Sequence, residues 1–549
     1  MTDPNPVTAP SDGHMRREIG LLSLTFIGVS GVLGSGWLFA PLLASQLAGP
    51  AALLAWLLGG LAIGLLAMTF AEIAAMLPVA GGIARLPQFS HGNVVSMAMG
   101  WSAWVGYNTT APIEVEAMLR YLAPHFPWLY HSDTAGHLST LGMTAAGAML
   151  LIFTVVNIFG VRFFARINAS ITWLKILVPV VVAVTLIADG FEGANLAAGG
   201  GFFAMGAEGI LASIASGGII FAFIGFRHTI DLAGEAKNPQ FTVPVAILLT
   251  ILICFLVYGL IQLAFIGALS PSDLENGWKA LHFSGQFGPL SGLAAAIGIL
   301  WLVSLLNVGA VIAPLGGGLV SVGSMGRLAL ALAQNGFFPR VLETLNRFGV
   351  PAYAMMVNFV VASLVFVLLP FQEVLSLNGA AIILSFAVGP VALISLRRLD
   401  PARPRGFRLA AAGILAPTAF IVATLIIYWS GWDTYWRLAA CLGVGLVLLL
   451  IKVRNTRGER LDLAEAAWLL PYLLGLGIFS YLGDFGHGRG IIPFGWDILL
   501  IAVFCTLTFW YAVHCRLSRE KYVGYIREEK VFEQGEYVRP DRDNQTRAE

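Results

Sequence analysis

The stretch GVSGVLGSGWLFAP, residues 28–41, lies inside the first long apolar run of the sequence. It carries four glycines, Gly28, Gly31, Gly34 and Gly36. Glycine weakens a helix, and a helix in lipid has to satisfy its own backbone. Close packing on another helix explains Gly28 and Gly31, but it explains the sequence GSG poorly because Gly36 leaves their face. The stretch therefore predicts either a very close helix contact or a helix that is interrupted at GSG.

The composition is that of an integral membrane protein. Of the 549 residues, 57% are hydrophobic and 11% are charged, whereas soluble domains carry about 25% charged residues. We therefore expect the lipid bilayer as a partner and no nucleic acid. The first 20 residues are polar and place Arg16 and Arg17 directly before the first apolar run, so no cleavable signal peptide is expected.

Histidines, cysteines and acidic residues are the usual candidates for metal binding and catalysis. The nine histidines show no HExxH spacing, and the four cysteines show no paired spacing. We therefore expect no metal, no other cofactor and no disulfide framework. The sequence also contains no GxGD, serine–histidine or acyltransferase-like histidine–aspartate motif, so we do not expect an enzyme.

Fourteen apolar runs are long enough to cross a bilayer, which takes about 20 residues. They lie at 21–44, 50–77, 93–122, 139–160, 167–188, 209–234, 244–269, 290–324, 352–369, 373–395, 409–430, 435–451, 464–482 and 495–514. With the N-terminus in the cytoplasm, and leaving out the C-terminal tail, 18 arginines and lysines fall on the cytoplasmic side against 4 on the other. The count predicts a multi-pass protein of the plasma (inner) membrane with both termini cytoplasmic.

The sixth run resembles the first in having a glycine in its middle. It reads GGIIFAFIGFRHTIDLAGEAKNP, residues 217–239, with Gly225 followed by Arg227. Interrupted helices five spans apart are typical of an inverted five-plus-five repeat, whose broken halves meet at the bilayer midplane. The helix N-terminus beyond Gly34 would bind a carboxylate, and the carbonyl groups that end the preceding half would bind an ammonium group. A ligand with both groups is an amino acid.

Four motifs resemble those of the amino acid–polyamine–organocation superfamily of secondary transporters. They are GVLGSGWLFAP, AEIAAMLPVAGGIARLPQ, FAFIGFRHTIDLAGEAKNP and GRLALALAQNGFFP, spread over residues 20–400. The last of them is expected to form a cytoplasmic surface helix. GSGWLFAP, PIEVEA, FRHTIDLAGEAKNPQ and the fourteen spans are similar to the archaeal/bacterial transporter subfamily that includes aspartate–proton symporters.

The resemblance implies an all-α, leucine-transporter-type fold with discontinuous helices 1 and 6. The expected parts are a cytoplasmic N-terminal tail (1–20), a first repeat (21–188), a second repeat (209–395), four accessory spans (409–514) and a cytoplasmic C-terminal tail (516–549). The accessory spans are expected to pack outside the core or against a second protomer of a homo-oligomer. By position, the substrate would contact Ser30, Gly31, Gly34, Ser35, Gly36, Phe221, Ala222, Phe223, Ile224 and Gly225. Phe221 or Phe226 is expected to form an aromatic gate, with simple packing as the alternative.

Arg227 departs from the superfamily pattern, in which many members carry glutamate at this position. A buried arginine needs a partner. Its guanidinium could bind the side-chain carboxylate of a substrate, which would favour aspartate or glutamate. The alternative is an internal ion pair with Glu114 or Glu116 in the third span.

Two further residues are candidates for proton coupling. Glu114 has no local partner, because Glu116 lies about 200° away on the helix and can pair with Arg120 four residues on. Lys175 lies in the apolar run ITWLKILVPV, where, in proton-coupled relatives, a lysine replaces the sodium ion of sodium-coupled ones. The alternative is a lysine that reaches the cytoplasmic surface.

The remaining polar residues of the core are expected near the cytoplasmic end or beside the site. Asp231 and Glu235, four residues apart on one helix face, are expected with Glu72 to form a gate or structural hydrogen bonds. His228 could carry a proton or simply pack. Asn307 and Ser385 are expected beside the site.

The sequence therefore predicts a secondary active permease that imports an acidic amino acid by proton symport. An amino acid exchanger, or a proton-coupled carrier of neutral amino acids or amines, would share the motifs of spans 1 and 6. Lys175 favours coupling, since a pure exchanger has no need of a titrating lysine there.

Overall fold

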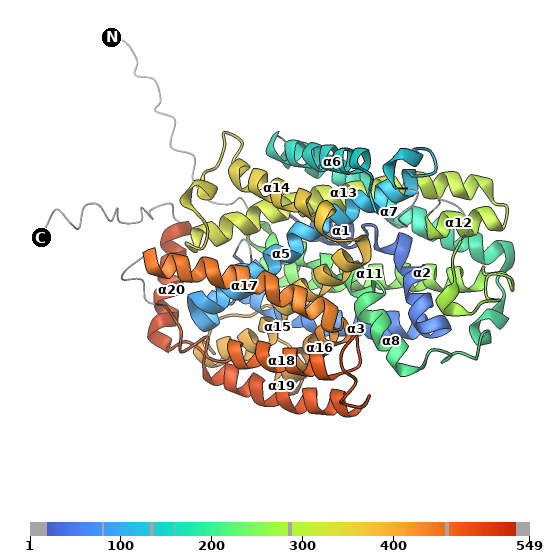
Figure 1. Cartoon of the computed structure of the whole chain (residues 1–549). Coiled ribbons are helices and arrows are strands. Elements are labelled where there is room, and N and C mark those ends of the chain that lie inside the picture. The colour runs from blue at the N-terminus through green and yellow to red at the C-terminus, as the bar shows by residue number, and fades with distance from the viewer. Residues whose placement is uncertain are drawn as a thin grey trace, which may run out of the picture.

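The computed structural model is a bundle of helices (Figure 1). It describes residues 19–79, 82–131, 137–159, 161–283, 288–455 and 461–533, and the side chains of 161–170, 452–455 and 528–533 are excluded from the description. Within these residues the chain forms no strand, only two isolated β-bridges. Most of the N-terminal tail, the end of the C-terminal tail and several charges used to orient the spans lie outside the described residues.

The described residues up to Asp231 form ten α-helices. They are α1 (Leu21–Val32), α2 (Gly36–Ala48), α3 (Ala52–Met76), α4 (Gly82–Arg85), α5 (Gln88–Leu122), α6 (Thr140–Phe159), α7 (Val161–Gly190), α8 (Gly206–Ser216), α9 (Ile219–Phe223) and α10 (Arg227–Asp231). The described residues after Asp231 form ten more. They are α11 (Pro239–Gly267), α12 (Pro289–Ala296), α13 (Leu300–Gln334), α14 (Ala352–Leu368), α15 (Phe371–Leu399), α16 (Ala412–Trp429), α17 (Trp432–Asn455), α18 (Leu469–Leu482), α19 (Trp496–His514) and α20 (Arg519–Glu533).

In the described part, nine helical segments are long and apolar enough to cross a membrane. The helical segments Gly206–Ser216 and Ile219–Asp231 are bent by 44° at their junction. If this pair counts as one span, the number of spans becomes ten. Three shorter apolar helices, α1, α14 and α18, occupy further expected spans. The protein is therefore an all-helical, multi-pass membrane protein.

The eighth expected span, 290–324, has different bounds in the structure. A short helix, α12, ends at Ala296, and the long helix α13 begins at Leu300 and continues to Gln334. The motif GRLALALAQNGFFP is thus the end of α13 and not the separate surface helix expected from its sequence. Its Leu328 and Leu332 are buried, so this part of α13 packs against the rest of the protein.

The C-terminal helices enclose one side of the core. Figure 1 shows α18 and α19 along one edge of the bundle and α6 and α14 along the opposite edge. Within the bundle, α15 packs against α5 and α16, and its apolar stretch is wholly buried. The last helix, α20, is amphipathic and is anchored by Lys521, whose ammonium group donates to Asp462 at 2.8 Å and to Glu465 at 2.7 Å.

Candidate functional site

The first helix is interrupted at GSG. Helix α1 ends at Val32, and α2 begins at Gly36. Between them Leu33 has a non-helical backbone, with ψ at 67°. The interruption expected from the glycines is therefore present.

The same glycines also allow a very close contact with the sixth span. A methyl group at Gly31 would overlap the His228 ring and crowd the Gly225 carbonyl, and one at Gly36 would meet Ala222 at 2.8 Å. A methyl group at Gly225 would overlap the Gly31 backbone in turn. The two explanations of the glycine-rich stretch, close packing and interruption, thus both apply.

The sixth span is irregular at two places and not only at Gly225. A bend of 44° separates α8 from α9 at Gly217–Gly218, where Gly218 adopts a left-handed φ of 85°. The expected interruption is a single 3-10 turn, Ile224–Phe226, between α9 and α10. The sharper bend therefore precedes the turn beside Gly225 by about two helical turns.

The N-terminal end of α2 is occupied by a carboxylate of the chain itself. Glu114, in α5, is 3% exposed, and its Oε2 accepts a hydrogen bond from the Ser35 main-chain N–H at 2.8 Å. A methyl group at Gly34 would overlap this carboxylate, and one at Gly317 would lie 3.1 Å from it. The absence of side chains at these two glycines makes room for Glu114.

An ammonium group of the chain occupies the end of α1. The Lys175 Nζ donates to the Ser30 carbonyl at 2.8 Å and to the Ser30 hydroxyl at 3.1 Å. Lys175 is 1% exposed, so the alternative of a lysine that reaches the cytoplasmic surface is wrong. Gly316 makes room for Lys175, as its neighbour Gly317 does for Glu114. The Lys175 ammonium group and the Glu114 carboxylate interact electrostatically. Both ends of the interrupted helix thus hold the kind of group that an amino acid carries.

Arg227 is buried beside α5, but neither expected glutamate is its partner. Its Nη2 donates to the Thr110 hydroxyl at 3.0 Å, and its guanidinium lies over the Tyr107 ring, 4.1 Å from the centroid. Glu116 pairs with Arg120 at 3.0 Å, as expected from their spacing. The Nε and Nη1 atoms of Arg227 have no hydrogen-bond partner among the described residues.

Several residues around Arg227 were not anticipated from the sequence. The Tyr107 hydroxyl donates to Asp231 at 2.6 Å. Asn378, in α15, donates to the Thr110 hydroxyl at 2.8 Å. A single asparagine within the apolar run of α15 was the available signal, and its partner on α5 could not be read from the sequence.

Tyr258, in α11, connects the two irregular helices. Its hydroxyl lies 2.7 Å from the Val32 carbonyl and 3.1 Å from the Ala222 carbonyl. Its ring stacks on Trp56 with centroids 4.7 Å apart. Because one hydroxyl has one hydrogen, Tyr258 fully satisfies only one of these carbonyl groups at a time.

The aromatic residues expected at a gate are buried. Phe221 lines a small cavity of about 10 Å³ together with Ser35 and Gly36. Phe226 packs on Phe386, with ring centroids 5.1 Å apart, and is fully buried. Asn307 accepts a hydrogen bond from Ser291 at 3.3 Å, and the Ser385 hydroxyl donates to the carbonyl of Ile382 in its own helix.

The acidic residues expected together at the cytoplasmic end are separate. Helix α10 ends at Asp231, so Glu235 does not share a helix face with it. Glu235 instead lies 4.0 Å from Arg327. Glu72 is fully buried, and its two oxygens accept from Arg397 at 2.8 and 2.5 Å. The structure thus places these acids in three different environments.

His228 is enclosed between the first and eighth spans. Its Nδ1 lies 2.8 Å from the Ser324 hydroxyl, and its ring packs over Gly31. It is 1% exposed. This environment agrees with the packing alternative for His228.

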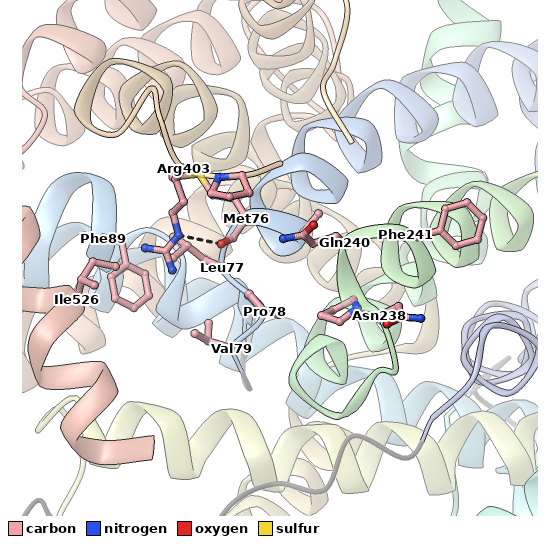
Figure 2. Close-up of a pocket in the computed structure, with 13 residues that line it drawn as sticks. Met76, Leu77, Pro78, Val79, Phe89, Asn238, Gln240, Phe241, Arg403 and Ile526 are labelled. Carbon is pink, nitrogen blue, oxygen red and sulfur yellow. Dashed lines mark hydrogen bonds between the residues drawn. The ribbon is translucent and has the colours of Figure 1, made fainter. Parts of the chain in front are cut away.

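The larger cavity lies elsewhere, at the ends of α3 and α11. It has a volume of about 730 Å³ and opens beside α20. Figure 2 shows Arg403 at its wall, where its Nε donates to the Met76 carbonyl at 3.1 Å. The cavity shares no lining residue with the interrupted helices.

Comparison with known proteins extends these observations. A family model described as amino acid permease matches residues 19–455. The chain is 33% identical to the glutamate/serine transporter AimA of Bacillus subtilis over 501 residues. This aligned region covers 89% of this chain and 92% of that protein. The chain is also 33% identical over 516 residues to the aspartate-proton symporter of Bacillus subtilis, covering 92% and 98%. The branched-chain amino acid permease BcaP of the same organism is 25% identical over 461 residues, covering 80% and 94%.

Proposed function

The chain belongs to the amino acid permease family, and from this premise we propose that it imports an acidic amino acid together with protons by alternating access. The observation that carries the proposal is the pair of internal charges at the interrupted first helix. Glu114 occupies the N-terminal end of α2, and Lys175 occupies the carbonyl end of α1. An amino acid carries the same two groups and can replace either one.

The substrate would bind between the interrupted segments. Its carboxylate would take the place of Glu114 at the Ser35 main-chain N–H, where the helix dipole also favours negative charge. Its ammonium group would bind carbonyl groups freed by the two irregular helices. The residues assigned to this site are Ser30, Gly31, Gly34, Ser35, Gly36, Phe221, Ala222, Phe223, Gly225 and Arg227.

Arg227 would select an acidic side chain. Its buried guanidinium has two nitrogen atoms without a partner among the described residues, Nε and Nη1. Leaving a buried polar group unsatisfied costs about 1–3 kcal/mol, and more for a charged group. A carboxylate of the substrate would satisfy it with a charge-assisted hydrogen bond.

Proton coupling would use Glu114 and Lys175. When the substrate displaces Glu114, the displaced carboxylate is buried without its hydrogen-bond donor, which is costly unless a proton neutralises it. When Lys175 loses its proton, it carries no charge at the end of α1, which loosens that half-helix. We assign Phe226, Asp231 and Glu235 to the gates that open and close the site.

The proposed topology has fourteen spans in a five-plus-five inverted repeat with accessory spans 11–14. Spans 1–5 occupy 21–188, spans 6–10 occupy 209–395, and the accessory spans occupy 409–514. The helix breaks in α1–α2 and α8–α10, five spans apart, support this arrangement. We assign both termini to the cytoplasm and the protein to the plasma (inner) membrane, and the excess of arginine and lysine in the expected cytoplasmic segments supports this orientation.

A second candidate is transport of a small neutral amino acid, by exchange or with protons. One of the relatives is named a glutamate/serine transporter. The test is uptake of labelled L-aspartate into sodium-free proteoliposomes, with and without an inward proton gradient. Gradient-driven accumulation of aspartate supports the proposal, whereas uptake of serine without aspartate supports the second candidate.

A further inference from the structure

A carboxylate lies one helical turn from Arg227 and is bound by another residue. Asp231 follows Arg227 by four residues in α10, a spacing at which opposite charges on a helix can pair. Yet Asp231 Oδ2 accepts from the Tyr107 hydroxyl at 2.6 Å, while Arg227 donates through Nη2 to Thr110. Both charged residues are 5% exposed or less, so bulk solvent does not screen them from one another.

Tyr107 contacts both charges at once. The face of its ring lies under the guanidinium of Arg227, 4.1 Å from centroid to Cζ, and its hydroxyl binds Asp231. The ring attracts the cation without using any of its N–H groups. The Tyr107 side chain thus stabilises Arg227, whose Nε and Nη1 atoms have no partner among the described residues.

In the other contact of Arg227, with the Thr110 hydroxyl, Arg227 can only be the donor. The Thr110 hydroxyl donates to the Gly106 carbonyl at 2.9 Å, so it can act only as an acceptor toward its other neighbours. It accepts from Arg227 and from Asn378 at 2.8 Å. One end of the guanidinium is therefore held in place, and Nε and Nη1 remain without a partner in the described part of the chain.

We propose that Tyr107 determines substrate specificity by holding Asp231 away from Arg227, so that the guanidinium stays available for the side-chain carboxylate of the substrate. This inference rests on the proposed function. Tyr107 is a positioning residue here, because it acts on the substrate through Arg227 and Asp231. Without its hydroxyl, Asp231 would pair with Arg227 and compete with an acidic substrate.

The test compares L-aspartate with L-asparagine, which differ in the carboxylate and amide of the side chain. Tyr107→Phe keeps the ring under Arg227 and releases Asp231. In proteoliposomes the ratio of kcat/KM for aspartate to kcat/KM for asparagine is expected to fall about tenfold or more. The reason is that aspartate loses its charge-assisted hydrogen bond with Arg227. The double variant Tyr107→Phe/Asp231→Asn removes the competing carboxylate and is expected to restore the ratio.

Tyr428→Phe is the matched control. The Tyr428 hydroxyl donates to Asp497 at 2.6 Å, the same bond at the same distance, between the accessory helices α16 and α19. This variant loses an equivalent hydrogen bond but should leave the ratio unchanged. A purely structural loss at Tyr107 would lower both rates together and would not be rescued at residue 231.

The outcomes separate the two proposals. Transport of aspartate by the natural protein, with an unchanged ratio in Tyr107→Phe or no rescue in the double variant, overturns the role of Tyr107 alone. A natural protein that does not transport aspartate overturns the acidic substrate, and the role of Tyr107 with it. A fall in the ratio followed by rescue supports both.

Discussion

The Ser35 main-chain N–H donates a hydrogen bond to the Glu114 carboxylate at 2.8 Å. This bond joins the first residue before α2 to the C-terminal third of α5 and fills the helix N-terminus that an amino acid carboxylate would use. The structure therefore has a carboxylate of its own at the place where the substrate is proposed to bind.

Gly34→Leu should abolish substrate binding without preventing membrane insertion. Any side chain at Gly34 overlaps the Glu114 carboxylate and fills the interruption between α1 and α2. The measurement is binding of labelled L-aspartate to membranes, normalised to the amount of inserted protein. Gly64→Leu in α3 is the control, because a side chain there meets nothing within 4 Å. Normal aspartate binding by Gly34→Leu would sink the role of the interrupted segment.

Lys175→Ala should abolish accumulation driven by a pH gradient. The variant removes the ammonium group that binds the Ser30 carbonyl and leaves no titrating group at the end of α1. Exchange of internal for external aspartate, measured as counterflow, needs no proton step and should continue. Lys279→Ala removes an exposed lysine outside the site and serves as control. Concentrative uptake at the natural level in Lys175→Ala would rule out the lysine as the coupling group.

Arg227→Lys should weaken aspartate transport although the charge is kept. Lysine lacks the planar fork of N–H groups that can bind Thr110 and a substrate carboxylate together. Losing one hydrogen bond to a charged group corresponds to about a tenfold to hundredfold rise in KM. Arg398→Lys, in which an exposed arginine beside Trp510 is replaced, is the control. An unchanged KM for aspartate would show that Arg227 does not contact the substrate.

Lys521→Met should lower stability by roughly 0.5–1 kcal/mol, because the lysine is half-exposed and its ion pairs are screened. Hydrogen bonds to Asp462 and Glu465 raise the pKa of Lys521 above its usual value. A raised folded-state pKa means that this stabilisation is complete below the usual lysine pKa and is lost only as the pH rises through the raised one. The difference in Tm between the natural protein and the variant should therefore be the same at pH 6 and at pH 9.

The control for this prediction is Lys237→Met, which replaces an exposed lysine in the segment between α10 and α11. Its Tm should match that of the natural protein at both pH values. A Tm difference that is present at pH 6 and absent at pH 9 would contradict the raised pKa. No Tm difference at either pH would contradict the anchoring of α20 by this side chain.

Local sequence patterns predicted the features that depend on neighbouring residues. The apolar runs predicted an all-helical membrane protein, the spacing of Glu116 and Arg120 predicted their ion pair, and GSG predicted the interruption of the first helix. Each of these follows from the properties of residues within one helical turn or one apolar run. For that reason they could be read without knowing how the helices pack.

The partner of Arg227 could not be predicted in this way. The sequence offered Glu114 and Glu116, but the guanidinium contacts Tyr107 and Thr110. The relative rotation of α5 and α10 decides which face meets Arg227, and it depends on packing across the whole bundle. A hydroxyl and an aromatic ring can stabilise a cation, yet they carry no charge that a sequence search would single out.

The separation of Asp231 from Glu235 had a different cause. Four-residue spacing puts two side chains on one face only while the helix continues, and α10 ends at Asp231. The end of that helix is set by the turn Ala233–Glu235, which binds back to the chain near Ile19. A contact between residues more than 200 positions apart thus decides a local pattern.

The proposed function requires that aspartate and protons move together. Proteoliposomes that contain the purified protein and an entrapped pH-sensitive dye measure this directly, in the absence of sodium and of an imposed gradient. Addition of external L-aspartate should acidify the lumen as labelled aspartate enters, and Lys175→Ala should abolish the acidification. Entry of labelled aspartate with no change in internal pH would contradict the account.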